Sequence, residues 1–244
     1  MWIRTHSPID GLLGGGIPTG VITHVYGEAA SGKTTLAMQA AGNLSAEGYQ
    51  TLYLDCDGRF SFERFSQLFQ DEDLLERLTL IVPRSLDEQT EMVSILEAYV
   101  SGRTRLVVVD TIASNYRSEL SPETHFSRYR EVVEKQLPEM LGLCRRRRNL
   151  AVLLLNQVVS RIGDGEGNTV PSMGDGINKF CQVTLRLSGT RLRSVGVAEI
   201  VEHFLDLKGR VFYRITGRGL CEVESETVSL LECGEDASQV SFLR

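Results

Sequence analysis

The segment 27–35, which reads GEAASGKTT, constrains the fold of this chain more than any other feature. It matches the pattern G-x-x-x-x-G-K-[ST], with an apolar run before it and a helix-forming run, LAMQAAGNL, after it. Glycines let the backbone turn its N–H groups towards phosphate oxygens, and the first turn of a helix adds the positive end of its dipole. The sequence therefore predicts a phosphate-binding loop (P-loop, Walker A motif) between a buried strand and a helix.

Three side chains of this loop have expected roles towards ATP and Mg²⁺. Lys33 is expected to reach the β- and γ-phosphates. The Thr34 hydroxyl is a hard oxygen donor of the kind that Mg²⁺ prefers, and Thr35 follows it near the α-phosphate. A simple strand-to-helix corner needs neither the lysine nor the hydroxyls, so that alternative is much the weaker. The residues predicted to bind the nucleotide are Gly27, Glu28, Ala29, Ala30, Ser31, Gly32, Lys33, Thr34 and Thr35.

Around this loop, short apolar runs rich in β-branched residues alternate with longer amphipathic segments, as in a doubly wound α/β domain. The predicted strands of a parallel sheet are 21–26, 51–55, 78–82, 106–110 and 151–155, and the predicted helices are 33–47, 61–69, 86–100 and 122–148. After a Gly-rich stretch, three further strands of more antiparallel character are predicted at 183–187, 197–204 and 211–215.

Local signals mark some of the helix boundaries. Ser85 and Glu88 have the spacing of a capping box, and Ser121 followed by Pro122 is a typical helix start. Pro138 lies inside the last predicted helix of the parallel part, where it should kink that helix or divide it in two.

Composition limits the protein's class and location. The 244 residues suit one α/β domain, so we expect a core over 1–220 and an acidic tail over 221–244 that packs on the core, with one added strand, or frays from it. The net charge of -6 argues against coating nucleic acid by bulk positive charge, so a DNA site must be local. No stretch approaches the roughly 18 apolar residues of a membrane span, and the five cysteines are scattered. These features predict a cytoplasmic protein without membrane contact.

Two other predicted strands end in polar residues. Asp110 follows a run of valines, at the position where the water shell of a nucleotide-bound Mg²⁺ needs an anionic acceptor (the Walker B position). Gln157 ends the strand LLLNQ, where its amide is placed to bind the γ-phosphate and respond to its loss. Each has a structural alternative: Asp110 as a cap of the turn at Thr111, and the Gln157 amide as a partner for backbone groups.

The segments IDGLLGGGIPTGVITHVYGEAASGKTT, YLDCDGRFSFERF, VVVDTIASNYRSEL, LLLNQV and RITGRGL follow one another in this chain. In this order they resemble the RecA-type recombinases, over nearly all of the chain up to about residue 219. The resemblance implies a RecA-like P-loop NTPase core, with a twisted, mostly parallel sheet, helices on both faces and C-terminal antiparallel strands. It also implies ATP and Mg²⁺ as cofactors and single- or double-stranded DNA as a partner.

The resemblance also implies roles for individual residues. Asp57 stands where the family has a glutamate that polarises the attacking water; the shorter carboxylate predicts slow hydrolysis. Arg64 matches an arginine that stacks on adenine, although an arginine on a helix surface can instead pair with a nearby acid.

Two segments, 114–121 and 160–179, correspond to loops that face DNA in the family. Both also contain acids, and ordinary surface loops remain the alternative. The residues expected to contact DNA are Tyr116, as a stacking ring, and Arg117, Arg161 and Lys179, as cations. In the second loop, Gly174-Asp175 stands where the family has paired glycines.

Further basic residues gather in the run 145–148, RRRR, which ends a predicted helix. There, cations complement the helix dipole, and this interpretation is favoured over a nucleic-acid patch.

Three functions remain open on this sequence. The first is an ATP-dependent DNA-binding protein of homologous recombination. The second is a mediator that uses ATP as a switch and acts by contact with the main recombinase or a Holliday-junction nuclease. The third is a KaiC-like signalling ATPase, ranked last because Cys56 stands where adjacent acids are expected. Only a short leader precedes Gly11, so the sequence does not settle whether the protein forms oligomers or filaments.

Overall fold

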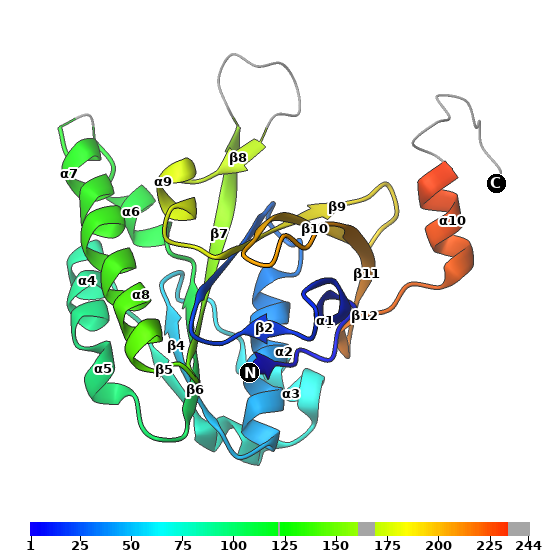
Figure 1. The fold of residues 1–244 in the computed structure, drawn as a ribbon, viewed down its shortest axis with the longest axis horizontal. Coiled ribbons are helices and arrows are strands. Elements are labelled where there is room, and N and C mark those ends of the chain that lie inside the picture. Colours follow the sequence, from blue (N-terminus) through cyan, green and yellow to red (C-terminus); the bar gives the residue numbers. More distant parts are fainter. Residues whose placement is uncertain (122, 161–168, 234–244) are drawn as a thin grey trace.

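The computed structural model describes residues 1–121, 123–160 and 169–233 (Figure 1). Its strands are β1 (Trp2–Ile3), β2 (Ile17–Pro18), β3 (Ile22–Gly27), β4 (Gln50–Asp55), β5 (Leu78–Ile81), β6 (Thr104–Asp110), β7 (Ala151–Ser160), β8 (Thr169–Pro171), β9 (Val183–Gly189), β10 (Val195–His203), β11 (Arg210–Thr216) and β12 (Gly219–Cys221). Ten of these described strands form one sheet in the order β12-β11-β10-β9-β3-β7-β6-β4-β5, with β8 beside β7.

The sheet is parallel from β5 to β9 and antiparallel from β9 to β12. All eight predicted strands are present, and the predicted fold class is confirmed. β9 differs from expectation, because it pairs in parallel with β3 and in antiparallel with β10. It joins the two parts of the sheet. β7 also extends to Ser160, beyond the predicted end, and pairs there with β8.

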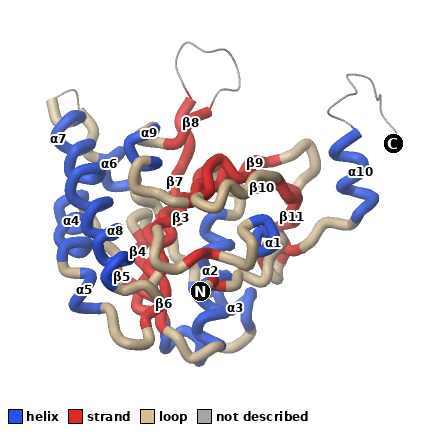
Figure 2. The backbone as a smooth tube through the Cα atoms, viewed as in Figure 1, coloured by secondary structure: helices blue, strands red, loops and turns tan. Residues whose placement is uncertain are grey.

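The described helices are α1 (Ile9–Leu12), α2 (Lys33–Ala46), α3 (Phe62–Phe69), η1 (Glu72–Arg77), α4 (Leu86–Ser94), α5 (Leu96–Tyr99), α6 (Ser114–Ser118), α7 (His125–Arg130), η2 (Glu131–Gln136), α8 (Leu137–Arg146), α9 (Asp175–Asn178) and α10 (Ser225–Cys233). Helices α4 to α8 lie on one side of the parallel strands, with α2 and α3 on the other (Figures 1 and 2).

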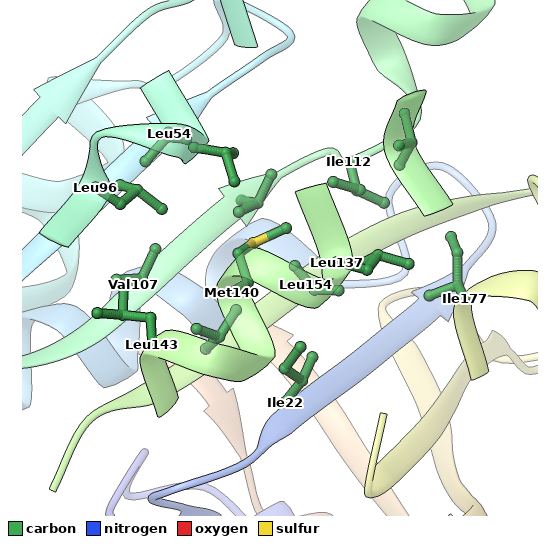
Figure 3. Close-up of a cluster of buried hydrophobic side chains, with 14 of the residues drawn as sticks. Ile22, Leu54, Leu96, Val107, Ile112, Leu137, Met140, Leu143, Leu154 and Ile177 are labelled. Atoms are coloured by element: carbon green, nitrogen blue, oxygen red, sulfur yellow. The ribbon is translucent and has the colours of Figure 1, made fainter. Parts of the chain in front are cut away.

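Each face of the sheet has its own apolar core because both faces of a parallel sheet are covered. On one face, Val107 and Leu154 pack against Leu137 and Met140 of α8 (Figure 3). On the other, strand residues pack against Leu36 of α2 and its neighbours. Burial of each such side chain contributes about 1.5–3 kcal/mol, so the two cores fix the strand ends that carry the polar residues.

The predicted helix 122–148 is divided, as Pro138 suggested. α8 begins at Leu137 directly after the π-helical segment η2, with Pro138 in its first turn, and the backbone stays in the right-handed helical region across this junction. The segment before it begins at His125 and continues as a π-helix, η2. Pro122 lies outside the described residues. The predicted helix 86–100 is also divided, at Ile95.

The predicted capping box is only half present. The Ser85 hydroxyl accepts the Glu88 N–H at 3.1 Å. The Glu88 carboxylate accepts the Arg84 N–H at 2.8 Å instead of reaching the backbone of Ser85.

The C-terminal segment contains a helix that the sequence did not predict. β12 already ends the sheet at Cys221, and a helix, α10, follows it. Leu231 of α10 packs on Val195 and Phe212, which fixes the helix against β10 and β11. Residues 234–244 lie outside the described part. No described helix has the length and apolarity to span a membrane.

Candidate nucleotide-binding site

The P-loop connects the end of β3 to the start of α2, as predicted. Gly27 is required by close approach, because a Cβ there would lie 2.1 Å from the Leu187 carbonyl oxygen. Gly32 has a φ of 93°, and a Cβ there would lie 2.9 Å from the Leu220 side chain. The first N–H groups of α2 have no partner within the helix and point out of its N-terminus. The loop can therefore offer backbone donors to an anion.

The Lys33 ammonium lies over this loop. It donates to the carbonyl oxygens of Gly27 at 2.9 Å and Glu28 at 2.6 Å, and it contacts the Ser31 hydroxyl at 3.3 Å. Burial lowers the pKa of Lys33 to about 8, and nearby acids, Asp110 foremost, oppose that shift. These two carbonyl oxygens accept hydrogen bonds from the same Lys33 N–H groups that phosphate oxygens would bind.

Asp110 at the end of β6 faces Thr34 at the start of α2. The Thr34 hydroxyl donates to Asp110 Oδ2 at 2.8 Å, and the buried Tyr53 hydroxyl donates to the same oxygen at 2.7 Å. Burial raises the pKa of Asp110, while these two hydrogen bonds lower it. The observed side-chain hydrogen bonds of Asp110 are thus made with Thr34 and Tyr53, and not with the turn at Thr111. A hydroxyl and a carboxylate oxygen side by side form a donor set that suits Mg²⁺.

Asp57 follows β4 and lines the same cleft as Lys33 and Asp110. The Ser114 hydroxyl donates to Asp57 Oδ1 and itself lies 2.8 Å from the Thr111 hydroxyl. Burial raises the pKa of Asp57, whereas the positive charges of nearby arginines lower it. One oxygen of this half-buried carboxylate is therefore already engaged by the protein.

Gln157 lies opposite Gly27 in the parallel register of β7 and β3 and lines the cleft. Its neighbour Asn156 points to the other face of the strand. There the Asn156 amide donates to the Ser172 carbonyl at 2.9 Å and contacts His24 Nε2 at 3.3 Å. His24 Nδ1 lies 3.1 Å from the Asn178 amide oxygen, and burial lowers the His24 pKa to about 4. Asn156 and Gln157 are neighbours on β7, so the hydrogen bond of Asn156 joins the strand end that lines the cleft to the segment that follows β8.

Arg64 at the start of α3 also lines the cleft, but not as an acid-paired surface residue. Its guanidinium donates to the carbonyls of Thr216 at 2.7 Å and Gly217 at 3.3 Å. These carbonyls fix the plane of the guanidinium at the edge of the cleft, whose volume is about 490 Å³.

Sequence reasoning missed several residues of the cleft, among them Asp55, Arg59, Ile215 and Thr216. Asp55 accepts the N–H groups of Arg59 at 3.1 Å and Phe60 at 2.7 Å and so shapes the loop that carries Asp57. The DCDG sequence could have indicated this role, because a carboxylate after a strand often binds following N–H groups. Nothing local to the sequence indicated that β11 reaches the site.

The structure places the residues expected to contact DNA in different surroundings. Tyr116 is only 4% exposed, so its ring is packed within the protein, and its expected contact with DNA stays a prediction. Its ring is packed because α6 follows β6 directly and places Tyr116 against His125, with 6.1 Å between the ring centroids. Arg117 is half-buried and Lys179 is exposed at the end of α9. Arg161 lies outside the described residues.

The arginine run lies at the end of α8, and two of its side chains pair with an acid of a neighbouring helix. Arg146 and Arg147 pair with Glu97 of α5 at 2.8 and 3.8 Å.

Comparison with known proteins relates these features to one family. A family model described as Rad51 matches residues 1–192. The chain is 36% identical to the DNA repair and recombination protein RadB of Pyrococcus furiosus over 224 residues, with 89% of this chain and 94% of that protein covered. For RadB of Archaeoglobus fulgidus, the identity is 33% over 214 residues, with 87% and 94% covered.

A solved structure gives the same result. The crystal structure of the RadB recombinase matches with a TM-score of 0.75 at 32% identity and covers 91% of this chain and 100% of that one. The chain therefore belongs to the Rad51 family, and the resemblance to RecA-type recombinases expected from its motifs is confirmed.

Proposed function

We propose that this chain is a cytoplasmic, ATP-binding and slowly hydrolysing protein of homologous recombination and DNA repair, which binds DNA and modulates the main recombinase. The observation that carries the proposal is the convergence of Lys33, Thr34 and Asp110 on one cleft at the carboxyl ends of the parallel strands. Ligands bind at this edge in open α/β sheets.

The donors in the cleft suit a nucleoside triphosphate with its metal. Lys33 and the first turn of α2 would bind the phosphates, Thr34 and Asp110 would hold Mg²⁺, and Arg64 would lie against the base. When bound, Mg²⁺ neutralises part of the charge of the phosphate oxygens. Gln157 would bind the terminal phosphate, and its neighbour Asn156 supports a role as a sensor because it contacts the segment after β8.

Asp57 supports slow hydrolysis. Its side chain is one methylene shorter than the glutamate that the family resemblance leads one to expect, and Ser114 already engages one of its oxygens. A water-polarising carboxylate must lie within hydrogen-bond reach of the water. ATP would then act mainly as a switch.

A second candidate is a mediator that does not hydrolyse ATP and acts by contact with the main recombinase or a Holliday-junction nuclease. The same Asp57–Ser114 contact favours it. The KaiC-like signalling ATPase is less favoured, because the buried Cys56 occupies a position where that class is expected to carry an acid.

Calorimetric titration with ATP and Mg²⁺ tests the binding site. Wild type is expected to bind, and Lys33→Ala to lose most of the affinity. The control is Lys135→Ala, which removes an exposed lysine on η2 far from the cleft. Undiminished binding by Lys33→Ala refutes the site.

ATP turnover with and without single-stranded DNA separates the two leading candidates. DNA-stimulated turnover of wild type supports the slow ATPase and excludes the non-hydrolysing mediator. Unmeasurable turnover of wild type that appears in Asp57→Glu supports the mediator.

A further inference from the structure

Arg59 is a cation of the nucleotide cleft that lies outside the P-loop, between β4 and α3. Of the residues that the structure describes, three cations line this cleft: Lys33, Arg59 and Arg64. Lys33 donates to carbonyl oxygens of the P-loop, and Arg64 donates to those of Thr216 and Gly217. Among the described residues, the Arg59 guanidinium has no hydrogen-bond or ion-pair partner, and only its backbone N–H is bound. Its donors are therefore available to a ligand.

The loop that carries Arg59 is held at both of its ends. The first two N–H groups after β4 donate to the Asp110 carbonyl oxygen at 2.7 and 3.3 Å. Further along, the Asp55 carboxylate accepts the N–H groups of Arg59 and Phe60 at 3.1 and 2.7 Å. Gly58 has a φ of 63°, a left-handed conformation that glycine adopts without strain. The backbone at Arg59 is thus fixed before a ligand binds, which lowers the ordering cost of binding.

The charge of Arg59 acts at the acidic end of the cleft. Three carboxylates of the described residues line it, those of Asp55, Asp57 and Asp110. Burial has the largest influence on the pKa of Asp57 and raises it, and among the nearby charges that of Arg59 opposes this rise most strongly. Asp57 is the carboxylate expected beside the attacking water, so the terminal phosphate of ATP would lie next to it. Because carboxylates repel a phosphate, a cation here favours its binding.

A guanidinium suits this task better than an ammonium. It is planar, carries its charge at every pH at which the protein is folded, and offers paired N–H donors that match two oxygens of one phosphate. ATP and ADP differ by the terminal phosphate alone. A cation placed at that phosphate therefore stabilises bound ATP and leaves bound ADP nearly unaffected.

We propose that Arg59 is a specificity-determining residue of the cleft, which binds the terminal phosphate of ATP and makes the protein prefer ATP to ADP. The assignment rests on the proposed function, since it presumes that the cleft binds ATP. The N–H groups of the P-loop serve phosphates that both nucleotides have, whereas Arg59 serves the one that distinguishes them. A switch between an ATP-bound and an ADP-bound state needs such a difference in affinity.

Calorimetric titrations with two nucleotides test the assignment, both in the presence of Mg²⁺. One is ADP, and the other is a non-hydrolysable ATP analogue with an imido group between its β- and γ-phosphates. Full-length wild type is expected to bind the analogue more tightly than ADP. In Arg59→Ala the affinity for the analogue should fall about tenfold or more, as the loss of a hydrogen bond between charged groups predicts. The affinity for ADP should stay within about twofold.

Two further variants sharpen the comparison. Arg59→Lys keeps the positive charge but loses the planar pair of donors, so it should keep part of the preference for the analogue. The matched control is Arg103→Ala, which removes an exposed arginine from the turn before β6, at the opposite end of that strand from Asp110. It should bind both nucleotides as wild type does. Arg59 is exposed and its backbone N–H remains in every variant, so urea titrations should show unchanged stability.

The outcomes separate the two proposals. If wild type binds neither nucleotide, the ATP-binding part of the proposed function fails, and the assignment of Arg59 with it. If wild type binds both and Arg59→Ala keeps the full preference for the analogue, only the assignment is overturned. An equal loss of affinity for both nucleotides in Arg59→Ala also overturns it, because Arg59 would then serve a shared phosphate or the shape of the loop.

Discussion

The hydroxyl of Ser114 donates a hydrogen bond to Asp57 Oδ1, which joins the first turn of α6 to the loop after β4. If Asp57 acts on the attacking water, this hydrogen bond restricts the orientation of the Asp57 carboxylate. Ser114→Ala should raise ATP turnover a few-fold, and Asp57→Glu should raise it about tenfold or more, because general-base catalysis depends steeply on geometry. Steady-state phosphate release measures both. Ser118→Ala, one turn further along α6, is the control. Reduced turnover in Ser114→Ala and Asp57→Glu would show that the hydrogen bond from Ser114 assists Asp57 instead of restricting it.

The hydrogen bond from Tyr53 to Asp110 predicts a loss of stability on its removal. Tyr53 is fully buried, and its hydroxyl donates to a carboxylate. Hydrogen bonds to charged groups contribute about 1.5–3 kcal/mol. Tyr53→Phe should lower the free energy of unfolding by about that amount in urea titrations. Tyr99→Phe, at an exposed tyrosine, should have no measurable effect. Equal stability of Tyr53→Phe and wild type would mean that Asp110 is satisfied without the hydroxyl.

The lowered pKa of Lys33 predicts proton uptake on ATP binding. Burial lowers this pKa to about 8 in the free protein, and bound phosphates favour the charged ammonium. ATP binding should therefore take up a fraction of a proton near pH 8 and above and almost none well below it. Calorimetry in two buffers of different ionisation enthalpy measures the uptake. Lys33→Arg keeps a charge at all these pH values, so uptake of the same size in that variant would assign the proton to another group.

The lowered pKa of His24 predicts that the protein loses stability in mild acid. Its pKa is about 4 in the folded protein, lowered by burial, against 6.5 in the unfolded chain. Between these values the unfolded chain binds more protons, so stability falls as pH decreases through this window, by up to about 1.4 kcal/mol per pH unit.

Denaturant titrations of wild type and His24→Gln at about pH 7 and pH 5 measure this effect. The difference in stability between the two pH values should be smaller in His24→Gln and unchanged in His6→Gln, which alters an exposed histidine. An identical pH dependence in all three proteins would mean that His24 is not the group that titrates.

The P-loop was predictable because its requirements are local: an apolar strand, two glycines, a lysine and hydroxyls within a few residues. Asp110 and Gln157 followed from strand ends, since parallel strands bring their carboxyl ends to one edge. The contact between Arg64 and Thr216 joins residues far apart in sequence, so no local sequence pattern could predict it. The burial of Tyr116 against His125 could not be predicted, because the sequence does not show whether a ring after a strand turns outwards or packs on a later helix.

Leu220 touches the phosphate loop from outside the motif. Its side chain abuts Gly32, and its N–H donates to Gln39 of α2 at 2.8 Å. The last strand of the sheet is thus a wall behind the loop. A chain shortened before Leu220 would keep every residue of the motif and lose the support that holds the motif in shape, so the smallest unit that can load a nucleotide is larger than the motifs themselves suggest.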